Sequence, residues 1–418
     1  MATIKSITAR EILNCLGNPT IETTVLLSDG TTGTASCPSG TSVSSYEAVE
    51  LHDTDQNRFH GLGVLKAIAN IEKIIAPKLI SMEATKQTDI DKAMIALDGT
   101  ENKSTLGANA ILSTSMAVAK AAALSLKLPL YEYLNDFLAE KNAITKIPIP
   151  IFNIINGGKH APEGPDIQEF ILVPASTKTY SESLLLVNNI YESLKNILQV
   201  NNYSTLVGAE GGFAPKLSSN ANAFTLLQQA IEATHSRLGY DVFLGIDSAA
   251  TTFYKNAHYS IREKGSLPAK QLIQYYEELV NEFHIIYLED ILAEDDWEGW
   301  VEANAQLAEN AMVVGDDVIS TNPYRLQMAL DKNAVNGVII KPNQIGTVTE
   351  AMAIVEVARI AGLKIIVSHR SGETNDDFIA DFGVAVNADY VKFGAPVRGE
   401  RVAKYNRLLE IEKELAKK

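Results

Sequence analysis

Cysteine is scarce in this chain, which has only Cys15 and Cys37 among 418 residues. Two isolated cysteines form neither the spaced set of a disulfide framework nor the paired spacing of a metal site. Structural disulfides are also typical of oxidising compartments, and we find no sign of such a framework here. We therefore expect a reduced protein in the cytoplasm.

Long apolar runs and an excess of positive charge are lacking as well. The N-terminal sequence MATIKSITAREIL has no apolar core of the kind that a signal peptide needs. The longest apolar stretch, residues 116–130, is interrupted by Lys120 and Lys127, so we expect no membrane insertion. The net charge is −15, whereas nucleic-acid binding needs clustered cations. We expect no nucleic-acid partner.

What the chain does contain is a strand pattern that recurs along its second half. Its length and its 46% apolar content are those of a globular protein with two domains. Residues 337–341, GVIIK, indicate a buried strand that stops at Lys341, because Pro342 cannot donate to a sheet and restricts the residue before it. Five other apolar runs end in or carry ionisable residues, namely Asp247, Glu289 and Asp290, Asp316 and Asp317, His369 and Arg370, and Lys392.

The spacing of these strand ends predicts a barrel. Successive ends from Glu289 to Lys392 are 23 to 28 residues apart, about one strand plus one helix. In a (β/α)₈ barrel the C-terminal strand ends meet at one mouth, where active sites lie. One charged residue after a strand is usually a solvated loop residue. Six strands with ionisable groups at the same end instead favour one shared polar site.

The first 135 residues follow another pattern. Residues 4–14, 21–27 and 32–37 indicate strands, and residues 64–79, 86–97 and 108–126 carry apolar residues at helical spacing. This predicts an α+β domain over residues 1–135, a linker over 136–146 and a β/α barrel over 147–418. The small polar loop 38–45, PSGTSVSS, is expected to be mobile, although most such loops are only connections and its neighbours would have to make it a lid.

Two glycine-rich loops supply further candidate residues. Gly157 and Gly158 precede His160, and residues 207–215, VGAEGGFAP, contain Glu210. Neighbouring glycines let a backbone approach a ligand closely. Each loop alone is weak support, since a solvated turn has the same composition.

Over its whole length the chain resembles the enolase family. The matching stretches are residues 17–20 (GNPT), 38–40 (PSG), 97–103 (LDGTENK), 153–158 (NIINGG), 168–170 (QEF), 295–300 (DDWEGW), 343–347 (NQIGT) and 368–374 (SHRSGET). The resemblance implies an N-terminal α+β domain that caps a modified barrel with an antiparallel second strand, assembled as a homodimer or a ring of dimers. The implied activity is that of a lyase of glycolysis, the reversible dehydration of 2-phospho-D-glycerate to phosphoenolpyruvate.

The resemblance also implies a metal site. Asp247, Glu289 and Asp316 match the family's metal ligands, and such hard oxygen ligands suit Mg²⁺. Sites of this superfamily generally use a Lys or His base with one or two Mg²⁺ ions. Two Mg²⁺ ions are therefore implied, the second recruited with the substrate. Ser39 resembles the lid residue that joins this second ion when the lid closes.

Roles in the reaction follow from the same resemblance. Lys341 matches the general base, and we expect Lys392 and Mg²⁺ to disfavour its charged form and so lower its pKa. Glu210 matches the acid that protonates the departing C3 hydroxyl. Glu169 and His160 match supporting catalytic groups that also contact the substrate, and His369 matches a further catalytic residue. The remaining matches bind the substrate: Gln168 contacts it, Arg370 and Ser371 bind its phosphate, and Lys392 faces its carboxylate.

The chain departs from the family pattern in the lid and near the site. Asn14, Leu16 and Ala209 stand where Asp, Arg and Asp are usual, and the other differing residues are Val43, Ser44, Tyr46, His52, Glu163 and Phe393. Groups misplaced by an ångström cost ~10²-fold in rate. Because the matched acid and base are intact, we expect retained but slower enolase activity.

Two alternatives follow from these departures. Phe393 and the altered lid suggest a diverged superfamily dehydratase that acts on a related phospho- or phosphono-acid. The terminal pair Lys417 and Lys418 suggests a plasminogen-binding protein with reduced catalysis, found on the cell surface without a signal peptide. A lysine pair at a helix end is, however, usually only solvated.

Overall fold

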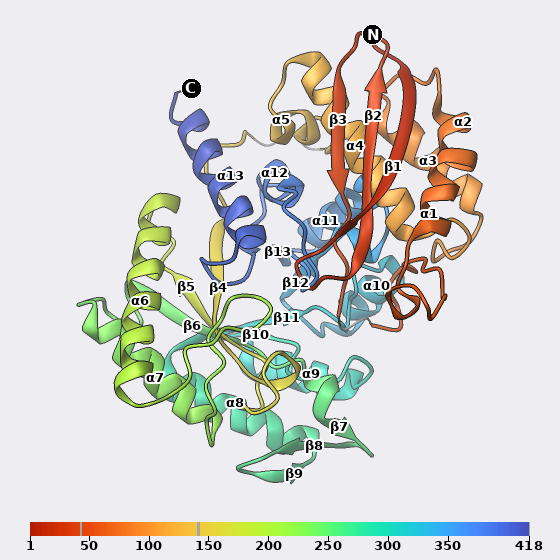
Figure 1. Ribbon diagram of the computed structural model, residues 1–418. Helices are drawn as coiled ribbons and strands as arrows, with labels where there is room; N and C mark the ends of the chain where they lie inside the picture. The colour runs from red at the N-terminus through yellow and green to blue at the C-terminus, as the bar shows by residue number, and fades with distance from the viewer. Residues whose placement is uncertain (42–43, 140–142, 418) are drawn as a thin grey trace.

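The computed structural model of the protein describes residues 1–41, 44–139 and 143–417 (Figure 1). Three features named above lie outside these residues: the lid substitution at Val43, residues 140–142 of the predicted linker, and Lys418. The predicted division into domains at residues 136–146 stays a prediction.

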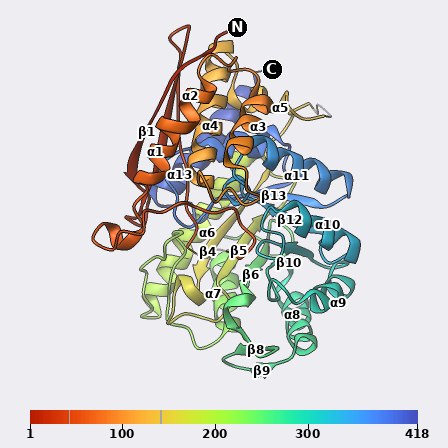
Figure 2. The same ribbon diagram turned by 90° about the vertical axis from the view of Figure 1, so that its right-hand side faces the viewer.

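An antiparallel sheet begins the chain, as predicted. Strands β1 (Ile4–Leu13), β2 (Pro19–Leu27) and β3 (Thr32–Ser36) pair in this order. The helices that follow are α1 (Leu65–Asn70), α2 (Ala76–Leu79), α3 (Gln87–Asp98), α4 (Ala108–Leu126) and α5 (Leu130–Asn135), with a π-helical turn, Ile71–Ile75, joining α1 to α2. In Figures 1 and 2 this sheet and its helices lie at one end of the molecule, above the barrel.

Helix α4 forms the core of this N-terminal part. It packs on β2 and β3, and a Cβ at Gly33 of β3 would lie 2.5 Å from the carbonyl oxygen of Ala117. The alanines of α4 and this glycine therefore allow the helix to approach the sheet closely. Among the described residues α4 is the one helix long and apolar enough to span a membrane, but 78% of it is buried in this core.

Eight strands form a closed barrel with one reversed strand. The order around the barrel is β10-β11-β12-β13-β14-β4-β5-β6, and β5 is antiparallel to both of its neighbours while the other pairs are parallel. The bounds are β4 Ile149–Asn156, β5 Glu169–Pro174, β6 Val242–Asp247, β10 Ile285–Glu289, β11 Met312–Gly315, β12 Gly337–Ile340, β13 Lys364–Ser368 and β14 Tyr390–Lys392. The antiparallel second strand implied by the resemblance is confirmed.

Helices surround the barrel (Figure 1). They are α6 (Tyr180–Val200), α7 (Asn220–Ala233), α8 (Ala269–Phe283), α9 (Trp297–Leu307), α10 (Pro323–Lys332), α11 (Val348–Ile360), α12 (Phe378–Ala385) and α13 (Gly399–Leu415). A small sheet, which the sequence did not predict, follows β6 and consists of β7 (Tyr254–Lys255), β8 (His258–Ile261) and β9 (Gly265–Leu267). The barrel interior is a second, separate core filled by Ile151, Ile171, Val173, Tyr287, Val314, Ile339 and Ile366.

Candidate active site

The C-terminal ends of the barrel strands surround a small polar cavity. Eleven predicted site residues line it, together with Ser368; they are His160, Gln168, Glu169, Glu210, Asp247, Asp316, Lys341, His369, Arg370, Ser371 and Lys392. The two remaining predicted residues are Glu289, which contacts Lys392 beside the cavity, and Ser39, which does not line it. The structure brings these residues together, while the role of each stays a prediction.

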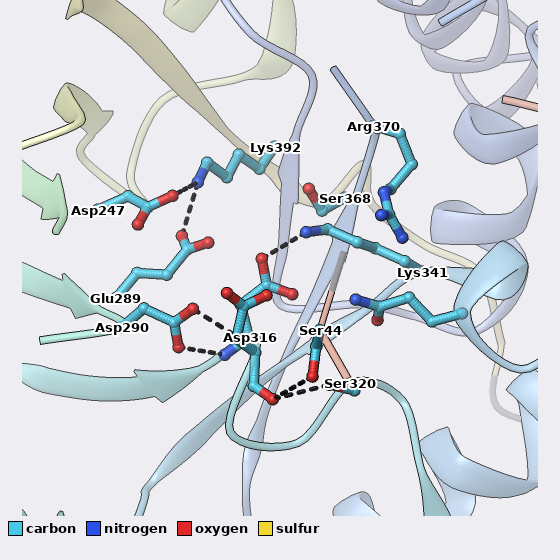
Figure 3. Close-up of polar contacts among 12 residues, drawn as sticks. Ser44, Asp247, Glu289, Asp290, Asp316, Ser320, Lys341, Ser368, Arg370 and Lys392 are labelled. Atoms are coloured by element: carbon cyan, nitrogen blue, oxygen red, sulfur yellow. Dashed lines mark hydrogen bonds and ion pairs between the residues drawn. The ribbon is translucent and has the colours of Figure 1, made fainter. Parts of the chain in front are cut away.

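Strand β12 delivers Lys341 to the cavity. The strand is fully buried and ends at Ile340, and a 3₁₀ turn, Pro342–Gln344, follows it. The backbone N–H of Lys341 donates to Thr321 Oγ1 at 3.0 Å. Its Nζ contacts the carboxylate of Asp316, which follows the neighbouring strand β11 (Figure 3). Parallel strand ends thus place an amine and a carboxylate side by side.

Lys392, at the end of β14, is the centre of a buried charge cluster. Its Nζ lies 3.0 Å from Asp247 Oδ2 and 2.8 Å from Glu289 Oε2 (Figure 3). It also lies 3.1 Å from Glu169 Oε2. The pKa of Glu289 is raised to about 8. Burial is the largest cause and Asp247 adds to it, whereas Lys392 lowers this pKa. Burial lowers the pKa of Lys392, but its carboxylate neighbours outweigh burial and hold it well above the usual value.

Two carboxylate oxygens at this cluster fit a divalent cation. Glu289 Oε1 and Asp316 Oδ1 are buried and have no hydrogen-bond partner among the described residues. A buried carboxylate oxygen without a partner is costly. Hard oxygen donors are the ligands that Mg²⁺ prefers. Asp247, Glu289 and Asp316 therefore have the chemistry of the predicted Mg²⁺ ligands.

A neighbouring acidic group fits a cation less well. The ligand atoms of Asp290, Asp316 and Asp317 lie within 4.8 Å of one another, which is a tighter cluster than the predicted set. Both oxygens of Asp290 are already used, however, because they accept the backbone N–H groups of Asp316 and Asp317 at 2.9 Å. Asp290 therefore fastens the ends of β10 and β11 together and so fixes Asp316.

The protein's own groups raise the pKa of Lys341, whereas the predicted lowering also counted on Mg²⁺. Burial is the largest single effect and lowers this pKa, but Asp316 and Glu289 together outweigh it, and the net pKa lies above the ordinary value for lysine. Arg370 is the neighbouring cation that lowers it. The sequence argument omitted this partner because Asp316 was considered only as a metal ligand. Lys341 must give up the ion pair with Asp316 before it can act as a base.

Glu169 and Glu210 form a pair of buried carboxyl groups beside His160. The ligand atoms of these three residues lie within 4.8 Å of one another. Burial raises the pKa of Glu169 well above its usual range, and Glu210 adds to the rise although Lys392 opposes it. Burial also raises the pKa of Glu210, but His160, His369 and Arg401 together outweigh burial. They hold this pKa well below the usual value for a glutamate. One proton on this pair therefore resides on Glu169.

His369 is fixed in one tautomer by Arg401. Arg401 Nη1 donates to His369 Nδ1 at 2.6 Å, so the ring carries its proton on Nε2, which faces Glu210 Oε2 at 3.6 Å. Burial, together with the Arg401 guanidinium, lowers the pKa of His369 to about 4. His369 is therefore neutral at pH 7 and turns an N–H, rather than a full positive charge, toward Glu210.

This assignment predicts how His369 responds to pH. The ring is expected to stay neutral from pH 8 down to pH 5, because its pKa of about 4 lies below the ordinary 6.5. As the pH falls below 6.5, the unfolded chain binds a proton at this histidine before the folded protein does. The free energy of unfolding that neutral His369 contributes is therefore present above pH 6.5 and is lost as the pH falls toward 4. Imidazole ¹⁵N NMR, with His369→Gln to assign the signal, checks this. A ring that titrates above pH 6 contradicts it.

Arg370, the predicted phosphate ligand, pairs with a carboxylate from the N-terminal part of the chain. Its two terminal nitrogens lie 2.7 and 3.2 Å from the oxygens of Glu47. Ser39 is held nearby, because Ser39 and Gly372 exchange two backbone hydrogen bonds of 2.9 Å and Asn14 Nδ2 donates to Ser39 Oγ at 2.7 Å. The segment that carries the predicted lid thus contacts the end of the barrel.

The departures from the family pattern lie in different surroundings. Phe393 is fully buried in the main core, 5.9 Å from the ring of Tyr405, and does not line the cavity. It therefore gives no support to an altered substrate. Ser44 Oγ donates to Glu294 at 2.6 Å, and the Tyr46 hydroxyl donates to Asp295 at 2.9 Å. These two substitutions tie the end of the lid segment to the loop before α9.

The fold is a barrel with a reversed second strand, and carboxylates and lysines gather at its mouth. Residues 4–134 match the family model of the enolase N-terminal domain, and residues 144–418 match that of the enolase C-terminal TIM barrel domain. The chain therefore belongs to the enolase family, whose activity is that of phosphopyruvate hydratase, a lyase.

Besides Ser368, two further residues at the site were missed by the sequence analysis. Arg401 is fully buried, and besides His369 it donates to the carbonyl oxygens of Arg370 and Ser371, both at 2.6 Å. It lies in α13, where no local pattern marks it. Glu47 lies in the N-terminal part, and its pairing with Arg370 depends on a contact across 323 residues of chain.

Proposed function

We propose that this protein catalyses the reversible, Mg²⁺-dependent dehydration of 2-phospho-D-glycerate to phosphoenolpyruvate. One observation carries the proposal: a single cavity is lined by an amine, Lys341 from β12, and by a carboxyl group, Glu210 from a separate loop. The reaction removes a proton from C2 and a hydroxide from C3, and therefore needs one base and one acid in the same site.

Asp247, Glu289 and Asp316 would hold the first Mg²⁺ ion, and Ser39 would join the second when the substrate is bound. When bound, Mg²⁺ stabilises the negative charge that develops on the substrate carboxylate during proton removal. The unpartnered oxygens of Glu289 and Asp316 support this assignment. Gln168, which also lines the cavity, would contact the substrate.

Lys341 would take the C2 proton on Nζ. Arg370 supports this role, because a neighbouring cation favours the neutral amine. Lys392 would face the substrate carboxylate. Arg370 and Ser371 would bind the phosphate, with Arg370 exchanging the Glu47 carboxylate for phosphate oxygens in the same paired geometry.

Glu210 would protonate the departing C3 hydroxyl. In the arrangement described above the proton of the pair lies on Glu169, and the pKa of Glu210 is low. The negative charges of the bound substrate raise the pKa of nearby carboxyl groups, which favours protonated Glu210. His160 and His369 would act as supporting groups, since both lie beside Glu210 at 4.0 and 3.6 Å.

The test is formation of the enol product from 2-phosphoglycerate, followed by ultraviolet absorbance. Turnover with Mg²⁺ that stops when EDTA is added is the expected result. Mg²⁺ binding without any turnover contradicts the proposed reaction and indicates that the protein acts on another phosphorylated or phosphonate acid.

The setting of the protein is proposed on the family resemblance alone. We propose a cytoplasmic homodimer or ring of dimers. Plasminogen binding at the cell surface stays a prediction, because Lys418 lies outside the described residues. Unchanged plasminogen capture after removal of residues 417 and 418 would discard the predicted contact.

A further inference from the structure

A buried phenol lies directly beneath the proposed metal site. Tyr287 is two residues before Glu289 on β10, so both side chains lie on the same face of the strand. Tyr287 is fully buried and belongs to the cluster that fills the barrel interior. The other members of that cluster are aliphatic. Tyr287 is therefore the polar exception in this interior core.

The neighbouring strand makes room for this ring. Tyr287 is paired in register with Gly245 of β6, and a Cβ at Gly245 would lie 2.9 Å from Tyr287 Cβ and 3.2 Å from its Cδ1. Gly245 does not have a positive φ, so its backbone conformation does not require glycine. The glycine instead leaves the space that the tyrosine ring occupies.

The hydroxyl of Tyr287 makes one specific contact. It donates to Glu289 Oε2, the oxygen that also accepts from Lys392 Nζ at 2.8 Å. The other oxygen, Glu289 Oε1, is buried and has no partner among the described residues. Two donors therefore hold one oxygen of this carboxylate and leave the second available.

We propose that Tyr287 is a positioning residue for the metal site: its hydroxyl fixes the rotation of the Glu289 carboxylate so that Oε1 is presented to the cation. Donors that orient a metal-ligating carboxylate tune its metal affinity. The inference rests on the proposed function, because it takes Glu289 as a Mg²⁺ ligand. Tyr287 itself does not line the cavity.

Substitution by phenylalanine separates this role from simple packing. Tyr287→Phe keeps the ring that fills the space beside Gly245 and removes only the hydroxyl. Tyr133→Phe is the matched control, because Tyr133 is equally buried, lies in α5 and has a hydroxyl without a hydrogen-bond partner among the described residues.

The measurement is the Kd for Mg²⁺ by isothermal titration calorimetry, with near-ultraviolet circular dichroism to confirm that each variant is folded. We expect Tyr287→Phe to weaken Mg²⁺ binding about 10-fold, and at least about 3-fold, since loss of such an orienting partner typically costs 10- to 100-fold. Tyr133→Phe is expected to match the unmodified protein.

The outcomes separate this inference from the proposed function. A Kd for Tyr287→Phe that changes less than about 3-fold overturns the positioning role. A similar weakening in Tyr133→Phe also overturns it, because the effect would then be general. An unmodified protein that binds no Mg²⁺ overturns the metal site itself, and with it the proposed function.

Discussion

Replacing Lys341 with alanine is expected to lower the turnover of 2-phosphoglycerate by about 10²- to 10⁴-fold, the range for loss of a general base. Lys341 is the amine that β12 delivers to the cavity, where its only ion-pair partner among the described residues is Asp316. Because alanine removes the proton acceptor but leaves Arg370 and Lys392 at the cavity, kcat should fall far more than the KM rises.

Lys364→Ala is the matched control for this variant. Lys364 begins β13 at the end of the strand away from the cavity, and its side chain is 55% exposed. Its removal should leave turnover unchanged, whereas the turnover that remains in Lys341→Ala sets the upper limit for any contaminating host enzyme. A Lys341→Ala variant that binds Mg²⁺ and keeps more than a tenth of the turnover would contradict the role of Lys341.

Replacing Lys392 with methionine is expected to lower the free energy of unfolding by about 3–5 kcal/mol when Mg²⁺ is removed with EDTA. The lysine is buried, and Asp247, Glu289 and Glu169 would lose their shared cation. Removing one partner of a buried ion pair is costly because the other charge stays buried. Urea unfolding measures the change.

The pH dependence of this loss gives a second check. The carboxyl groups left behind take up protons more readily when folded than when unfolded, so their folded pKa values are raised. The free energy of unfolding of the variant then falls as the pH rises from the pKa of these carboxyl groups in the unfolded chain toward their pKa in the folded protein. The loss in Lys392→Met should therefore grow from pH 5 to pH 8, and added Mg²⁺ should reverse part of it.

Lys364→Met again supplies the control. Its ion pair with Asp389 at 2.9 Å is exposed, and such pairs contribute about 0–1 kcal/mol. If Lys392→Met costs no more than Lys364→Met, then the buried cluster does not depend on its lysine.

The sequence predicted the barrel because of a feature peculiar to parallel strands. Strands buried on both faces are continuous apolar runs, and each ends in a residue that the barrel mouth exposes. Lys341 and Lys392 could be placed in this way. The direction of the reversed strand β5 could not, since the apolar run FILVP that follows Glu169 reads the same for either direction; only the family resemblance implied it.

Other parts of the site depend on contacts that no local pattern reveals. Arg401 fixes His369 from α13, and Glu47 pairs with Arg370 from the other end of the chain. The predicted lowering of the Lys341 pKa counted on Lys392 and Mg²⁺ and left out Asp316, which raises this pKa. Tyr287 has the burial of a core residue, and its role is visible only in the contact of its hydroxyl with Glu289.

The central claim is the division of labour between Lys341 as base and Glu210 as acid. It is tested most directly by proton NMR of 2-phosphoglycerate in D₂O with Mg²⁺, which follows exchange of the C2 hydrogen separately from product formation. Glu210→Gln is expected to exchange this hydrogen while forming little product, and Lys341→Ala is expected to do neither. Exchange that persists in Lys341→Ala, or that disappears in Glu210→Gln while Mg²⁺ still binds, would contradict the account.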